Sequence, residues 1–205
     1  MNSYFKTPPL VMNLIIINVL VFMAQSYLPA DTVMPLANRL ALYSSAELFR
    51  PWQLVTYMFM HASWPHLFFN MFALWMFGRI LEYDLGTKRF IIFYFVSGIG
   101  AGLTQLLISS AAAVTVGASG AIFGVLLAFG MLHPNDRIML LFPPIPMKAK
   151  YFVIGYGALE LIIGISNPGG SIAHFAHLGG MLWGWLLLVY WRRRARQKAQ
   201  RRTYR

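Results

Sequence analysis

The sequence predicts an all-α polytopic membrane protein, a bundle of six transmembrane helices, and three observations carry this prediction. Of the 205 residues, 58% are hydrophobic and 11% are charged, whereas soluble domains have about 25% charged residues. The apolar residues form six separate runs, which lipid can solvate directly. Lys and Arg lie mostly on one side of these runs. We therefore expect one integral membrane domain, residues 1–191, followed by a basic tail, residues 192–205.

The predicted spans differ in length. A helix needs about 20 apolar residues to cross a bilayer, or fewer where other helices surround it. The six candidates are Leu10–Leu28, His66–Leu81, Phe90–Ile108, Ser119–Leu132, Tyr151–Ser166 and Ile172–Trp191. The first has 19 residues without a charge, so we expect a retained anchor rather than a cleaved signal peptide. Pro29–Pro65, which follows it, is too broken to span and too apolar to lie free in water, and this favours a structured outer interfacial loop.

The charge distribution predicts orientation and excludes nucleic acid as a partner. The net charge is +11, and eight basic residues lie between Arg192 and Arg205, directly after the last apolar run. Such a flank is typical of the cytoplasmic side, where it contacts anionic lipid headgroups. With the amino terminus inside, 15 of the 17 basic residues are cytoplasmic, and only Arg39 and Arg50 lie outside. We expect both termini in the cytoplasm and a bacterial inner membrane as the location. The inner basic residues before the tail are Lys6, Arg79, Lys88, Arg89, Arg137, Lys148 and Lys150.

The fourth span is unusually short. Ser119–Leu132 has 14 residues, and a helix of that length covers roughly 21 Å of a hydrocarbon core of about 30 Å. We expect its outer end to be recessed, so that the preceding Gly- and Ala-rich loop dips into the membrane. Irregular backbone is tolerated there only where it is buried in protein or lines water. The sequence therefore predicts a wet cavity that opens outward.

Three polar clusters at or inside the predicted spans are candidates for chemistry, because polar groups in lipid are costly. One runs from Gly117 through Ser119 to Gly124, one from Ala176 to Gly184, and one from His61 to Asn70. Taken singly, each has a structural interpretation. A serine at a helix start is commonly an N-cap, a buried histidine is as often a packing residue, and an asparagine can make an interhelical hydrogen bond.

Together the clusters predict an activated hydroxyl. The fourth and sixth spans both run from outside to inside, so Ser119 and His177 lie at similar depth. Small residues at a four-residue spacing let these two helices approach closely; they are Gly120, Gly124, Gly180 and Gly184. A base beside a hydroxyl is the minimal activated nucleophile, here without an evident acidic third member. The Ser119 amide, His66 and Asn70 are candidate donors to an oxyanion.

These clusters resemble those of the rhomboid family of intramembrane serine proteases. The resemblance runs from about Arg50 to Trp191 and combines the patterns GxSG, AHxxGxxxG and HxxxxHxxxN. It implies Ser119 as nucleophile and His177 as general base and then acid. It also implies His66, Asn70 and the Ser119 amide as the oxyanion hole. Substrates would be single transmembrane segments of other membrane proteins, with no cofactor and no metal.

We expect specific roles for several further residues. The resemblance implies a structural role for His61 beside the outer loop, stacking of Phe123 on the catalytic imidazole, and a tie between cytoplasmic helix ends through Glu82. Trp52-Gln53 stands where the family often has Trp-Arg, so the anchoring of the loop is in question. The glycines expected to support the site are Gly117, Gly120, Gly124, Gly180 and Gly184. Glu160, alone in the fifth span, is neutral, paired across helices or exposed to the cavity, and a structural hydrogen bond is favoured over a direct part in substrate handling. His174 is expected to line the cavity, and the alternative is that it tunes the base.

The leading hypothesis is an intramembrane serine endopeptidase with a Ser-His dyad. The alternative is a non-catalytic rhomboid-like binder of membrane proteins, which is disfavoured because both Ser119 and His177 are present. A metal or ion transporter is a third hypothesis. It is disfavoured because no acidic residue is expected beside the histidines and no inverted repeat is evident. Its histidines would be His61, His66, His174 and His177.

Overall fold

The computed structural model describes residues 7–109, 113–139, 144–167 and 173–203, and most of them are helical. Within these described ranges, three helices are by length and composition long and apolar enough to cross a membrane, namely α1 (Pro9–Tyr27), α6 (Thr87–Ile108) and α8 (Ala149–Ser166). Three residues used in the prediction lie outside the described residues. They are Lys6 and Arg205, which were assigned to the cytoplasmic side, and Ile172, the predicted start of the sixth span. The helical membrane protein expected from composition is confirmed.

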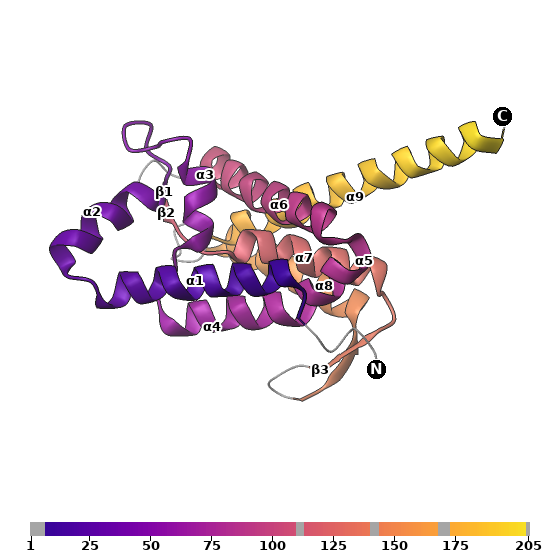
Figure 1. Cartoon of the computed structure of the whole chain (residues 1–205), viewed down its shortest axis with the longest axis horizontal. Helices are drawn as coiled ribbons and strands as arrows, with labels where there is room; N and C mark the ends of the chain where they lie inside the picture. The colour runs from indigo at the N-terminus through magenta and orange to yellow at the C-terminus, as the bar shows by residue number, and fades with distance from the viewer. Residues whose placement is uncertain (1–6, 110–112, 140–143, 168–172, 204–205) are drawn as a thin grey trace.

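The remaining predicted spans also coincide with helices. The second is a continuous rod of α4 (Trp64–Ala73), one π-helical segment η3 (Leu74–Gly78) and α5 (Arg79–Leu85). The fourth is α7 (Ser119–Leu132), with the predicted bounds. The sixth begins α9 (His174–Thr203), which continues without a break through the basic tail. The tail is therefore a helical extension that projects from the bundle, as Figure 1 shows at the carboxyl end.

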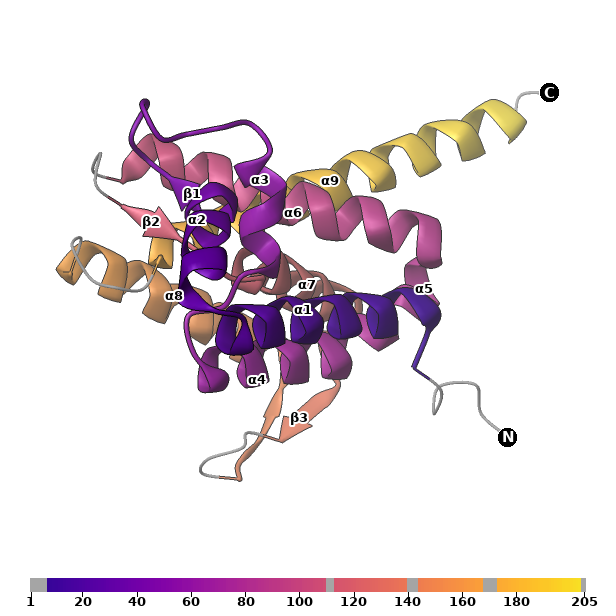
Figure 2. The same ribbon diagram turned by 60° about the vertical axis from the view of Figure 1, so that its left-hand side comes forward.

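Helix α7 lies in the middle of the bundle. Figures 1 and 2 show α6 and α9 on one side of it and α1 and α4 on the other, and α7 contacts α6, α8 and α9. Ten of its 14 residues are buried, although its length would cover only about 21 Å. A helix that is apolar on all faces is stable only when neighbours surround it.

Glycines let α7 approach α9 and α6. A Cβ added at Gly180 would overlap the carbonyl oxygen of Gly120, and one at Gly184 would lie 3.4 Å from the Cα of Gly124. At Gly124 an added Cβ would overlap Ser97 of α6 and lie 2.9 Å from the Gly180 carbonyl oxygen. These pairs succeed one another in the same order along α7 and α9, so the two helices run parallel, as the sequence predicted.

In the part of the chain that the structure describes, two small antiparallel ribbons depart from the expected all-helical fold. The ribbon of β1 (Leu42–Tyr43) and β2 (Val114–Thr115) pairs Leu42 with Thr115. It thereby joins the outer loop to the segment that leads into α7. The second ribbon pairs β3 (Arg137–Met139) with β4 (Pro146–Lys148). Two- and three-residue strands carry too little period-two alternation to be found in a sequence.

The loop between α1 and α4, for which the sequence predicted ordered structure, contains several short elements. It contains α2 (Ala30–Leu40), β1, the short α3 (Gln53–Thr56) and a 3₁₀ turn η2 (Tyr57–Phe59). Gln53 is buried, and its side-chain oxygen accepts from the amides of Tyr43 and Arg50 at 3.3 and 3.2 Å. Its side-chain nitrogen donates to the Leu48 carbonyl oxygen at 3.1 Å. Gln53 therefore anchors the loop without a charge in the place where the resemblance led us to expect arginine.

Glu82 holds the start of α1, in agreement with its expected role as a tie between helix ends. Its carboxylate accepts from the Val11 amide at 2.9 Å and from the Leu10 amide at 3.3 Å, in the first turn of α1. It also accepts from the Thr87 hydroxyl at 2.8 Å, at the start of α6. A negative charge at a helix amino terminus also interacts favourably with the helix dipole.

Replacing Glu82 with Gln is expected to destabilise the bundle without touching the candidate site. The neutral amide weakens three charge-assisted hydrogen bonds, each of which contributes about 1.5 to 3 kcal/mol when an ion is involved. The thermal midpoint in detergent should fall by several degrees. An unchanged midpoint would show that α1 is held by packing alone.

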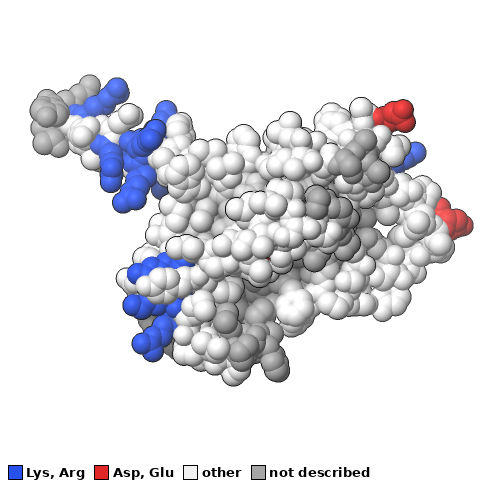
Figure 3. All heavy atoms as spheres, turned by 180° about the vertical axis from the view of Figure 1, so that it is seen from behind, with Lys and Arg blue, Asp and Glu red and all other residues white. Residues whose placement is uncertain are grey.

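On the face drawn in Figure 3, the charged side chains lie at the two ends of the molecule. In Figure 3 Lys and Arg cluster at the end from which the tail projects, and a band without charged side chains separates them from a few charged residues at the other end. An uncharged band between charged ends is the surface that a bilayer requires. The chain is an integral membrane protein.

Candidate active site

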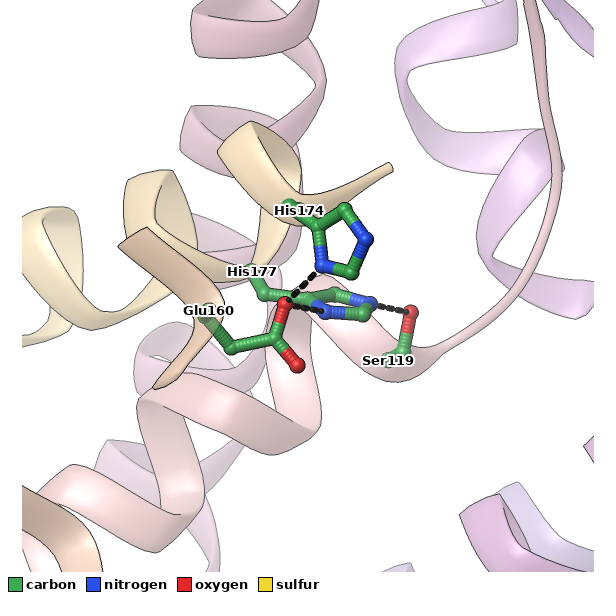
Figure 4. A network of polar contacts seen from close by, with 4 residues as sticks. All are labelled: Ser119, Glu160, His174 and His177. Carbon is green, nitrogen blue, oxygen red and sulfur yellow. Dashed lines mark hydrogen bonds and ion pairs between the residues drawn. The ribbon is translucent and has the colours of Figure 1, made fainter. Parts of the chain in front are cut away.

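Ser119 and His177 meet at the outer-loop end of the two parallel helices. Ser119 is the first residue of α7, and the N-cap position is occupied by Ala118. The serine hydroxyl therefore does not cap the helix, and its Oγ lies 2.8 Å from Nε2 of His177 in the first turn of α9 (Figure 4). The predicted contact between hydroxyl and imidazole is present.

An acidic group completes this arrangement, contrary to expectation. Oε2 of Glu160, from α8, lies 2.9 Å from Nδ1 of His177 and 2.7 Å from Nδ1 of His174 (Figure 4). All three side chains are largely buried. The expectation that no acidic residue accompanies the histidines was wrong, because it rested on neighbours in sequence whereas the partner comes from another helix.

Phe123 supports the face of the imidazole. Its ring stacks on that of His177, with centroids 4.2 Å apart and planes 7° from parallel. Tyr156 of α8 contacts Phe123 at a centroid distance of 5.0 Å. Phe123 lies one helical turn after Ser119, so the helix that carries the hydroxyl also restricts rotation of the imidazole. The expected stacking is present.

His66 and Asn70 stand one turn apart on α4. Ser63 caps this helix by accepting from the His66 amide at 3.3 Å. Nδ1 of His66 accepts from the Ala62 amide at 3.4 Å, which leaves its Nε2 to carry the proton of a neutral ring. Asn70 donates one amide hydrogen to the His66 carbonyl oxygen at 2.9 Å and retains a second. Both side chains can therefore donate into the space beside Ser119.

Gly117 allows His66 to approach the loop before α7. Its φ angle is +122°, and a Cβ built there would lie 2.7 Å from Nε2 of His66. Only glycine adopts this backbone angle readily, and only glycine leaves room for the ring. The Ser119 amide follows in the first turn of α7, where backbone N–H groups lack intrahelical partners.

His61 lies behind His66, outside the helical spans. Its backbone exchanges hydrogen bonds with the side chain of Gln25 in α1, at 3.2 and 3.4 Å. Its buried ring meets the His66 ring edge-on with centroids 5.0 Å apart. Burial, reinforced by the neighbouring His66, lowers the pKa of His61 to about 4, so the ring is neutral near pH 7. His61 thus links α1 to the segment before α4.

The side chains around Ser119 and His177 line a cavity of about 850 Å³. The polar side chains of the site that line it are Ser119, His177, His66, Asn70, Glu160 and His174. Aromatic and aliphatic side chains from α4, α7 and α8 form much of the remaining wall. An apolar cavity with a few convergent polar groups is typical of a site that binds and transforms a ligand.

Comparison with known proteins decides the family. The model of the rhomboid domain matches residues 48–194, most of the chain. The chain belongs to the rhomboid family.

Several curated rhomboids are similar to this one. Rhomboid protein 1, mitochondrial, of Saccharomyces cerevisiae is 33% identical over 219 residues, covering 98% of this chain and 59% of the yeast protein. The putative rhomboid protease YdcA of Bacillus subtilis is 33% identical, over 66% of this chain and 65% of its own. Rhomboid protease GlpG of Yersinia pseudotuberculosis is 30% identical, over 73% and 51%. This rhomboid thus spans roughly half to two thirds of the length of these relatives.

Glu160 and the two histidines could also hold a metal ion. Each of the residues Glu160, His174 and His177 offers one ligand atom, and these atoms lie within 4.8 Å of one another. Two histidines and one glutamate form a known ligand set for catalytic zinc. The sequence of this rhomboid contains a signal that could have revealed the cluster of Glu160, His174 and His177. A carboxylate in an apolar span needs a partner, and His174 and His177 share one face of α9 at a three-residue spacing.

Proposed function

We propose that this rhomboid is a serine endopeptidase that hydrolyses peptide bonds in or near transmembrane segments of other membrane proteins. The observation that carries the proposal is the 2.8 Å contact between Ser119 Oγ and His177 Nε2 inside the cavity. A neutral imidazole at hydrogen-bond distance can accept the hydroxyl proton as the oxygen attacks. Two of the similar proteins, from Bacillus subtilis and Yersinia pseudotuberculosis, are named as rhomboid proteases, the first as a putative one, and this supports the same reaction.

Acylation begins when Ser119 Oγ attacks the carbonyl carbon of the scissile bond and its proton moves to His177 Nε2. The carbonyl oxygen becomes an oxyanion, and the Ser119 amide, His66 and Asn70 donate hydrogen bonds to it. The intermediate collapses as the C–N bond breaks and His177 returns the proton to the leaving amine. The products are a released amine fragment and an ester on Ser119.

Deacylation repeats these steps with water. His177 takes a proton from a water molecule, the resulting hydroxide attacks the ester carbon, and the proton then passes to Ser119 Oγ as the C–O bond breaks. Water must therefore reach the ester inside the membrane. Only a neutral His177 ring can act as base, because the lone pair on Nε2 accepts the proton.

The proposal also includes the orientation of the protein in the membrane. With six spans, both termini in the cytoplasm and the location in a bacterial inner membrane, Ser119 and His177 lie below the outer surface. Substrate segments would enter from the lipid, and residues 192–205 would contact anionic headgroups.

A reporter fused after Arg205 should be active only on the cytoplasmic side. The basis is that 15 of 17 basic residues lie inside in this orientation. A paired phosphatase and fluorescent-protein fusion in bacterial cells reads the two sides independently. Phosphatase activity from the fusion would place the carboxyl terminus outside and invert the site.

The direct test of function is cleavage of a single-span model substrate in proteoliposomes. We expect two fragments whose new ends map within or next to the span, with turnover unchanged by a chelator. Binding of the segment without any cleavage would favour the non-catalytic binder instead. Turnover that a chelator abolishes and zinc restores would favour metal chemistry at Glu160, His174 and His177.

A further inference from the structure

We infer that Glu160 is a positioning residue for His177, so that the reactive group is a serine–histidine–glutamate chain rather than a dyad. The inference rests on the proposed serine protease function and deepens it. Its basis is the line of contacts from Ser119 Oγ to His177 Nε2, at 2.8 Å, and from His177 Nδ1 to Glu160 Oε2, at 2.9 Å. The two contacts use opposite nitrogens of one ring (Figure 4).

The carboxylate selects the tautomer of the ring. An ionised carboxylate only accepts hydrogen bonds, so Nδ1 of His177 must carry a proton to bond to Glu160. A neutral imidazole protonated at Nδ1 has its lone pair on Nε2, the atom that faces Ser119. The alternative tautomer would place a proton between Nε2 and the hydroxyl, and the ring could not act as base.

The carboxylate also stabilises the charge that forms. When the Ser119 proton reaches Nε2, the ring becomes an imidazolium in a largely buried place, where an isolated charge is costly. Oε2 of Glu160 at 2.9 Å supplies the opposite charge. The Nδ1 proton stays on the ring throughout, and the carboxylate remains ionised.

His174 fixes the carboxylate. Its Nδ1 lies 2.7 Å from the same oxygen, Oε2, and it stands one turn before His177 on α9. Two donors from one helix therefore hold one oxygen from α8 on the far side of the catalytic ring. A purely structural link between α8 and α9 would need only one of these hydrogen bonds. It would not need the bond to His177, whose ring contacts Ser119.

The inference predicts an effect on the rate of chemistry that a structural tie would not produce. Glu160→Gln is nearly isosteric but uncharged, and we expect kcat to fall by at least about 100-fold, with KM changed less than about twofold. Loss of the corresponding charge in a soluble serine protease costs about 10⁴-fold. Labelling of Ser119 by a fluorophosphonate should slow in parallel. Glu160→Asp, which keeps the charge but withdraws it by one methylene, should recover part of the loss.

Glu82→Gln is the matched control. Glu82 is also a buried glutamate that bonds across helices, but it does not line the cavity. We expect this variant to lose thermal stability while each folded molecule keeps the wild-type kcat. If Glu160→Gln behaved in the same way, with wild-type kcat and a lowered midpoint, Glu160 would be a structural tie only. That result would leave the protease function standing, provided that wild type cleaves and Ser119→Ala does not.

The tautomer of the His177 ring tests whether Glu160 positions it, and this test does not need a folded Glu160 variant or a cleaved substrate. Nitrogen NMR of the wild-type protein with ¹⁵N-labelled histidine, assigned through His177→Ala, reports which ring nitrogen carries the proton. We expect a protonated Nδ1 and an unprotonated Nε2 near neutral pH. A neutral ring protonated at Nε2 would overturn the inference.

Discussion

His177→Ala is expected to abolish both substrate cleavage and the covalent labelling of Ser119 by a fluorophosphonate. The Ser119 hydroxyl has its Oγ 2.8 Å from His177 Nε2, and without a base an aliphatic hydroxyl is a weak nucleophile near pH 7. Removing the histidine or the serine from a soluble serine protease lowers kcat by about 10⁶-fold. We therefore expect turnover below detection, measured by fragment formation in proteoliposomes.

His174→Ala is the matched control for this experiment. His174 is on the same helix and bonds to the same Glu160 oxygen, but its ring does not contact the Ser119 hydroxyl among the contacts found for the described residues. Labelling should slow but remain measurable in this variant. Labelling that survived in His177→Ala and was lost in His174→Ala would reassign the base to His174.

Gly180→Ala is expected to lower kcat by about 100-fold although it changes no reacting atom. The added Cβ would overlap the Gly120 carbonyl oxygen, and a backbone atom cannot rotate away as a side chain does. The two helices must separate, which moves Ser119 relative to His177. A misplacement of about 1 Å can lower a rate by about 100-fold. The measurement is kcat in proteoliposomes, together with the thermal midpoint, which overpacking should also lower.

Gly155→Ala provides the comparison for this substitution. Gly155 is in α8, and a Cβ built there meets no atom within 4 Å. The same chemical change should leave kcat at the wild-type value and slightly stabilise the helix, by about 0.5 to 1 kcal/mol. If Gly180→Ala cleaved as fast as Gly155→Ala, close approach at Gly120 and Gly180 would not be what brings Ser119 to His177.

Much of the helical framework could be predicted from the sequence, because apolar length is a strong signal in lipid. The bounds of α7 agree with the predicted Ser119–Leu132, and α1 and α8 each agree to within two residues at both ends. The four glycines also predicted the seam between α7 and α9. The short strands of the outer ribbon could not be found, since their pairing joins Leu42 to Thr115 across more than seventy residues.

The contact between Ser119 and His177 was predicted because each residue lies in a recognisable motif, and its extension to Glu160 was missed because Glu160 lies in none. GxSG and AHxxGxxxG placed Ser119, Phe123 and His177 correctly relative to one another. The partner of Glu160 depends on the rotation of α8 about its axis, which the nearly uniform apolar composition of that helix does not reveal. Gln53 was missed as an anchor because its partners are mainly backbone atoms of the loop, and a sequence does not show where these atoms lie.

The central claim is that Ser119 is a nucleophile activated inside the membrane domain. The most direct measurement is reaction of the purified protein with a fluorophosphonate, followed by proteolytic digestion and mass spectrometry of the labelled peptide. We predict a single modified residue, Ser119, and no labelling in Ser119→Ala. Modification of a different serine, or labelling that persists in Ser119→Ala, would contradict the claim.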